Sequence, residues 1–248
     1  MLRILEICVD SLTSARAAIA GGADRLELCS ALTIGGLTPY AALLEQIRQE
    51  SEIPIRCLMR PRGGDFLYTK EEIAMMAAQI RELKSVGANG FVIGCLTPEG
   101  DLDKEAMKPL MKAADGAGLT LHRCIDVSRN LLKTYSDAAE IGIDTVLTSG
   151  AASSCSAGID TLKKLLDLRE ACIGPEVLIG AGVSASNIRA LHAALPKARA
   201  FHASCKELIE SSMRFRRADI PMGLPGLDEW HIQQTSEAQV RILKKSLY

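Results

Sequence analysis

The chain has 248 residues, and 48% of them are hydrophobic, so it can bury a sizeable core. Its formal net charge is −1, which excludes a global electrostatic attraction to nucleic acid or to an anionic membrane. Four Phe, four Tyr and one Trp are too few to suggest a stacking surface for single-stranded nucleic acid.

One pattern recurs along the chain: a helix ends at glycine, one or two small or polar residues follow, and a strand begins. Glycine just past a helix is the usual left-handed cap. The pattern occurs at residues 21–28, 87–93, 118–122 and 142–147. We predict strands near residues 4–8, 25–29, 55–59, 90–94, 119–123, 144–148, 176–180 and 199–203.

The stretches between these strands have helical patterns. We predict that the first helix starts at Ser11 and that Thr38 caps the second, with Pro39 at its first position. Thr69 and Glu72 fit a capping box at the start of the third. That third helix covers about 70–86, and the remaining predicted helices cover about 103–116, 130–141, 159–172 and 186–195.

Eight strands alternating with helices predict a single (β/α)8 barrel over residues 1–248, with an open doubly wound sheet as the alternative. The strand-to-helix loops are the longer ones, and barrel active sites lie on that face. Residues 206–235 are expected to be an insertion before a last helix, which begins at Ser236 with a capping box. The basic cluster at 213–217 is either a cover over a ligand or an exposed or inter-subunit surface.

The loop at residues 59–66 places Arg60 and Arg62 on either side of Pro61, which fixes the backbone between them. Two guanidinium groups side by side suit a carboxylate or a phosphate. Gly63 and Gly64 then allow a tight turn. The alternative is a pair of surface arginines bonded to nearby acids.

Two carboxylates lie inside apolar strands, where they are costly to bury unless they are paired. Strand alternation places Glu6 with Cys8 and Glu27 with Cys29 on one face, and the two strands should be neighbours. The carboxylates are candidates for acid/base catalysis or for pairing with the arginines. A structural ion pair beneath the site is the alternative.

Further candidates follow later strands. His122 lies at the carboxyl end of the fifth strand, where it could carry a proton, and Asp126 follows in the loop. A core histidine bonded to a carbonyl is the alternative for His122. The turns at Gly150, Gly182 and Ser204 follow strands six, seven and eight, and such turns commonly hold phosphate in barrels. Ordinary barrel turns are the alternative.

Eight cysteines occur, none of them in a C-x-x-C pair, so no zinc ribbon or thioredoxin motif is indicated. No signal peptide and no long apolar span is visible in the sequence. We therefore expect a cytoplasmic protein with reduced thiols and no membrane partner. The sequence leaves a homo-oligomer open.

Taken together, several stretches resemble the CutC family, whose members are associated with copper homeostasis. The matching stretches are residues 6–11, 22–29, 35–39, 60–66 and 148–150. The sequence departs from the family pattern at Cys124-Ile125, where Ala-Phe is usual, and around Gly180-Ala181-Gly182.

The resemblance implies a cytoplasmic barrel linked to copper that binds Cu(I). Thiolates are ligands that Cu(I) selects, and Cys8 and Cys29 are expected neighbours. Two alternatives remain open. One is a metal-independent enzyme acting on a small phosphorylated or carboxylated metabolite, with Glu6, Glu27, Arg60, His122 and Asp126 as its catalytic residues. The other is a non-catalytic scaffold.

Overall fold

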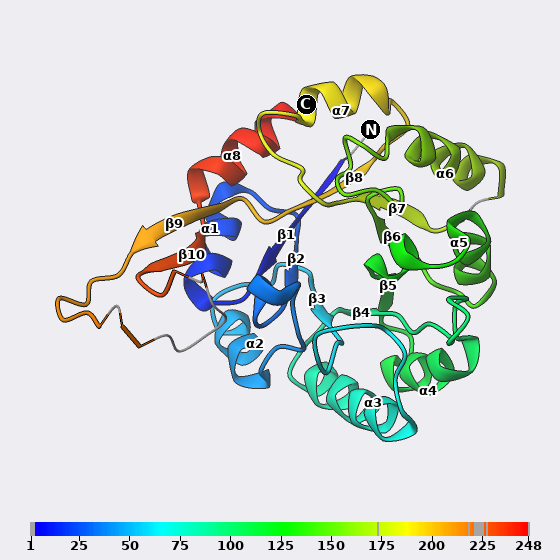
Figure 1. The fold of residues 1–248 in the computed structure, drawn as a ribbon, viewed down its shortest axis with the longest axis horizontal. Coiled ribbons are helices and arrows are strands. Elements are labelled where there is room, and N and C mark those ends of the chain that lie inside the picture. Colours follow the sequence, from blue (N-terminus) through cyan, green and yellow to red (C-terminus); the bar gives the residue numbers. More distant parts are fainter. Residues whose placement is uncertain (1–2, 173, 218, 221–225, 227, 248) are drawn as a thin grey trace.

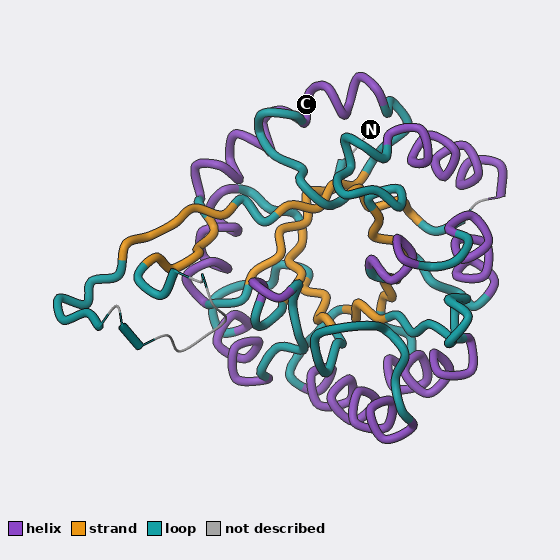
Figure 2. The backbone as a smooth tube through the Cα atoms, in the orientation of Figure 1, coloured by secondary structure: helices purple, strands orange, loops and turns teal. Residues whose placement is uncertain are grey.

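In the computed structural model, eight parallel strands close into a barrel in sequence order, and β8 pairs with β1. Helices surround this ring (Figure 1, Figure 2). The structure describes every residue except 1–2, 173, 218, 221–225, 227 and 248. The predicted (β/α)8 barrel is confirmed, because an open sheet would have two unpaired edges.

The observed elements lie within a few residues of their predicted positions. The barrel strands are β1 (Ile4–Val9), β2 (Arg25–Leu28), β3 (Ile55–Leu58), β4 (Gly90–Ile93), β5 (Gly118–Leu121), β6 (Thr145–Thr148), β7 (Glu176–Ile179) and β8 (Ala200–Ala203). In the described part of the chain the α-helices are α1 (Leu12–Gly21), α2 (Ala41–Arg48), α3 (Lys70–Ser85), α4 (Lys104–Ala114), α5 (Leu131–Glu140), α6 (Ile159–Cys172), α7 (Ile188–Ala194) and α8 (Glu237–Ser246). Two short 3-10 helices, η1 (Leu32–Ile34) and η2 (Arg123–Val127), follow β2 and β5.

Local capping chemistry explains where two helices begin. The Ser11 side chain accepts a hydrogen bond from the backbone N–H of Ser14 and starts α1. At α3, Thr69 and Glu72 form the predicted capping box, because each side chain accepts from the other's backbone N–H. Each bond satisfies a donor that the first turn of a helix leaves free.

The predicted start of the second helix at Thr38 is wrong, because α2 begins at Ala41 with Tyr40 as its N-cap. Thr38 is instead bonded to Arg60 on the next strand's loop. Its backbone N–H donates to the Arg60 carbonyl at 3.0 Å, and its hydroxyl accepts from the Arg60 N–H at 3.0 Å. These bonds tie the loop after β2 to the end of β3 and so position Arg60.

The predicted capping box at Ser236 does not form. Ser236 is the N-cap of α8, but its side chain makes no cap hydrogen bond. Its backbone N–H donates to the Cys205 carbonyl at 2.8 Å, which anchors the start of α8 beside the end of β8.

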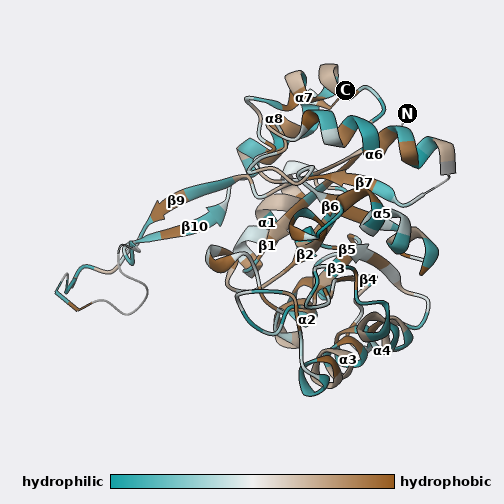
Figure 3. Cartoon of the chain, turned by 45° about the vertical axis from the view of Figure 1, so that its right-hand side comes forward, coloured by the Kyte–Doolittle hydropathy of each residue, from teal (hydrophilic) through white to brown (hydrophobic). Residues whose placement is uncertain are grey.

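The expected insertion contains an antiparallel pair, β9 (Lys206–Glu210) and β10 (His231–Thr235), which projects from the barrel as an arm (Figure 1, Figure 3). In the basic cluster at 213–217, Arg216 pairs with Glu210 at 2.9 Å and lies over the Trp230 ring, and Phe215 is exposed. The cluster is therefore part of the arm's surface. Other residues of the insertion lie outside the described ones. Among the described helices, none is both long and apolar enough to cross a membrane.

Candidate metal and ligand site

A cavity of about 430 Å³ opens at the carboxyl ends of the barrel strands. Glu27, Arg60 and His122 all line it, as the strand alternation predicts. Glu6 does not reach the cavity wall but lies fully buried and is bonded to His202, which lines the cavity. The strand ends therefore bring the predicted acidic and basic side chains into one region.

A buried ion-pair chain lies beneath the cavity. Glu6 accepts from the guanidinium Nε of Arg25 on one side, and its Oε1 lies 2.8 Å from Nδ1 of His202 on the other. The barrel register causes this contact, because β1 pairs with β8 so that Glu6 stands opposite His202. The structural ion pair considered as an alternative for Glu6 is thus present, and it also orients a cavity residue.

These contacts change the proton affinity of each group. Burial alone would raise the pKa of Glu6, but Arg25 and His202 beside it lower that pKa to about 2. Burial would lower the pKa of His202, yet the neighbouring Cys8, Glu27 and Glu6 raise it well above its ordinary value. Burial raises the pKa of Glu27, and the nearby Glu6 charge adds to that shift while His202 opposes it.

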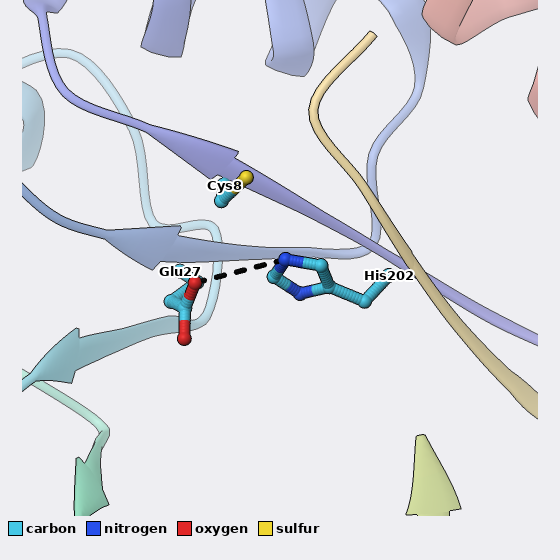
Figure 4. Close-up of side chains that lie close together, drawn as sticks. All are labelled: Cys8, Glu27 and His202. Carbon is cyan, nitrogen blue, oxygen red and sulfur yellow. Dashed lines mark ion pairs between the residues drawn. The ribbon is translucent and has the colours of Figure 1, made fainter. Parts of the chain in front are cut away.

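Three potential metal ligands lie close together at the cavity (Figure 4): Cys8 from β1, Glu27 from β2 and His202 from β8. Their ligand atoms all lie within 4.8 Å of one another. The His202 Nε2 and a Glu27 oxygen are 3.7 Å apart, which is longer than a hydrogen bond. A metal ion bonded at about 2.0–2.3 Å to sulfur, nitrogen and oxygen fits between such atoms.

Cys29 does not belong to this group within the described residues. Its thiol lies 3.5 Å from a Glu27 oxygen, to which it donates, and it packs against Leu58 and Val92. Burial and the Glu27 charge raise the pKa of Cys29 well above its ordinary value. Cys29 therefore supports the Glu27 carboxylate as a neutral thiol, and its sulfur, predicted as a second copper ligand, lies outside the ligand group among the described residues.

The two arginines of the loop after β3 have different surroundings. Arg60 is buried and lines the cavity. Arg62 is half-exposed and does not line it; its guanidinium bonds to Glu72 at 2.7 Å and to Asp65 at 3.0 Å. The structure thus gives Arg62 the surface ion pairs that were its alternative interpretation.

Two other candidates hold the backbone together beside the cavity. Asp126 accepts from the backbone N–H groups of Ser149 and Ala151, which fixes the turn after β6. Gly150 has φ +78°, and a Cβ there would meet the Gly158 carbonyl at 2.6 Å. Neither residue lines the cavity.

The turns after β7 and β8 do reach the cavity through Gly182 and Ser204. Asn187 closes the first of these turns, because its side chain donates to the Gly182 carbonyl and accepts from the Ser184 N–H. The position of these two residues agrees with the expected location of the ligand face.

The prediction from sequence missed His202 and Arg25 as members of the site. A signal was present, since barrel closure places the eighth strand beside the first, and His202 has the same inward parity as Glu6. Lys206 and Arg123, which also line the cavity, were missed as well.

Comparison with known proteins agrees with this architecture. The model of the CutC family matches residues 3–207. A Chromobacterium violaceum protein named family protein CutC is 40% identical over 248 residues, which covers 100% of this chain and 99% of that protein. A human protein named copper homeostasis protein cutC homolog is 37% identical, covering 97% of this chain and 87% of its own length.

Solved structures show the same fold. The crystal structure of CutC from Streptococcus agalactiae superposes with a TM-score of 0.76 at 26% identity, over 82% of this chain and 99% of that one. Phosphoribosylanthranilate isomerase from Pyrococcus furiosus superposes with a TM-score of 0.57 at 14% identity, over 98% of both chains. The second likeness shows the barrel fold alone.

Proposed function

Because this chain belongs to the CutC family, we propose that it binds one copper ion, as Cu(I), at the group formed by Cys8, Glu27 and His202. The ion is the protein's cargo or regulated ligand, in keeping with the name of the human relative. We also propose that the protein works in the cytoplasm, and the seven free thiols among the described cysteines support a reducing compartment.

The observation that carries the proposal is the orientation of His202. Its Nδ1 is held by Glu6 at 2.8 Å, which leaves Nε2 directed toward Glu27 and Cys8. Metal-binding histidines commonly donate their other ring N–H to a carboxylate in this way, which fixes the tautomer and the ring plane. Arg25 in turn holds Glu6.

The chemistry of the donor set fits copper in the reduced state. A thiolate is the ligand that Cu(I) selects, and an imidazole also suits copper. The Cys8 sulfur and His202 Nε2 supply these two donors, and the Glu27 carboxylate adds negative charge beside the ion. Two negatively charged ligands around a monovalent ion also offset part of the cost of burying its charge.

Titration of the protein with Cu(I) against a coloured competing chelator tests the proposal. We expect one equivalent of tightly bound Cu(I) per chain, and its loss in Cys8→Ser and in His202→Gln. Cys29→Ser is the matched control, because that thiol is buried beside the same carboxylate but lies outside the ligand group. Equal copper binding by wild type and Cys8→Ser would overturn the proposal.

A further inference from the structure

Arg60 is a buried cation for which the described part of the chain supplies no carboxylate partner. Its two terminal nitrogens donate to the carbonyls of Ile34, Gly36 and Gly64 at 3.0–3.1 Å, so the guanidinium is held in one orientation. Its Nε–H is buried and has no acceptor among the residues that the structure describes. Burying an unpaired charge and an unbonded donor is costly, so this arrangement calls for an anion.

His122 presents a second donor without a partner. Its Nδ1 accepts a hydrogen bond from the Cys124 backbone N–H at 3.2 Å, so the ring proton lies on Nε2. That Nε2 is buried and has no acceptor among the described residues. Burial and the nearby Arg60 charge lower the pKa of His122 to about 3, which keeps the ring neutral at physiological pH.

Both donors belong to one wall of the same cavity. The His122 and Phe66 ring centroids are 4.7 Å apart, and the Arg60 guanidinium lies 5.4 Å from the Phe66 centroid. Both side chains thus contact the Phe66 ring, and all three residues line the cavity. Among the described residues that line it, basic side chains outnumber acidic ones: Arg60, Arg123, His202 and Lys206 against the carboxylate of Glu27. Of these, Arg123 is paired with Asp126.

We propose that the cavity binds a small organic anion whose carboxylate or phosphate oxygens accept from Arg60 Nε–H and His122 Nε2–H. The volume of about 430 Å³ suits a small metabolite. Across the barrel, the turn after β7 adds the N–H groups of Gly182 and Val183, for which the structure records no acceptor among the described residues. A ligand with a second polar end could use them. This site does not depend on copper, because neither Arg60 nor His122 belongs to the proposed metal ligands.

Calorimetric titration of chelator-treated, metal-free protein with malonate and with glycerol 3-phosphate tests the proposal and separates the two anion classes. We expect at least one probe to bind wild type, and Arg60→Lys to weaken that binding at least roughly tenfold, because a charged hydrogen bond is lost. Arg62→Lys is the matched control, since it makes the same change two residues away at an arginine already bonded to Glu72. Failure of both probes to bind wild type, or equal affinity in Arg60→Lys, would overturn the inference.

Imidazole ¹⁵N NMR of wild type provides a second measurement, which does not depend on the folding of Arg60→Lys. The chain has four histidines, and His122→Gln identifies the signal of His122 by its disappearance. We expect the spectrum to show Nε2 protonated, and the Nε2–H resonance to shift when the bound probe saturates the protein. A saturated protein with an unmoved His122 signal would remove this residue from the anion site. Neither experiment involves copper, so a negative result would count against the anion site and would leave the copper proposal unaffected.

Discussion

A hydrogen bond between the side chains of His202 on β8 and Glu6 on β1 joins the last strand of the barrel to the first. Their side chains meet at 2.8 Å although 196 positions separate them in the sequence. The contact exists because β8 pairs with β1 in a register that sets Glu6 opposite His202. One fully buried carboxylate therefore holds both a structural arginine, Arg25, and a residue that faces the cavity.

Glu6→Gln should destabilise the fold by about 3 kcal/mol, because removal of one charge leaves the others buried and uncompensated. Arg25 and His202 both depend on this carboxylate, and their side chains are only 11% and 12% exposed. Urea denaturation at pH 7 measures the change in the free energy of unfolding.

Glu50→Gln is the control for that change. Its partner is Arg16, and the two side chains are 40% and 58% exposed, so water screens the pair. We expect a much smaller loss there, because exposed ion pairs contribute little to stability. Equal effects of the two substitutions would show that the buried ion pairs of Glu6 contribute no more to stability than a surface ion pair.

The loop that carries Arg60 should respond differently to alanine at two adjacent glycines. Gly64 has φ +90°, and its carbonyl accepts from Arg60, so Gly64→Ala should cost roughly 1–2 kcal/mol for the left-handed conformation. Gly63 has no positive φ, and a Cβ there would meet only the Ile34 side chain at 3.8 Å. Gly63→Ala should therefore be neutral, and thermal unfolding of both variants decides whether this difference exists.

Acid should destabilise the protein partly through His122. Its folded-state pKa of about 3 lies below the ordinary value of 6.5, so between those values the unfolded chain binds a proton that the folded chain does not. Stability is therefore fully present above pH 6.5 and falls as the pH drops toward 3. Near pH 5 this single residue should contribute a slope of about 1.4 kcal/mol per pH unit.

Denaturant titrations of wild type and His122→Gln from pH 7 to pH 4.5 measure that contribution as the difference between two curves. The subtraction removes the carboxylates and the other histidines, which titrate in both proteins. We expect wild type to lose stability more steeply than the variant as the pH falls. Parallel curves would mean that His122 titrates normally in the folded protein.

Strand alternation and barrel geometry were enough to predict that Glu27, Arg60 and His122 share one cavity, since each fact depends only on local sequence and on the fold class. The role of Thr38 could not be read the same way. Thr38 resembles a helix cap in the sequence, but its hydroxyl accepts a hydrogen bond from the backbone N–H of Arg60, which lies on another loop.

The difference between Arg60 and Arg62 also required the structure. Both residues occur in one short motif with the same spacing from Pro61, and the sequence does not say which carboxylates approach. The capping residue Glu72 accepts a hydrogen bond from Arg62, while the guanidinium of Arg60 donates to backbone carbonyl groups and has no carboxylate partner in the described part of the chain. The carboxylate of Glu72 therefore occupies Arg62 and leaves Arg60 as the arginine that is available to a ligand.

X-ray absorption at the copper edge, on protein loaded with one equivalent of Cu(I), identifies the atoms that bind the metal. We expect one sulfur ligand from Cys8 together with a nitrogen ligand from His202, and loss of the sulfur signal in Cys8→Ser. Cys29→Ser should leave the spectrum unchanged. A copper shell with two sulfur ligands, or with none, would contradict the proposed site.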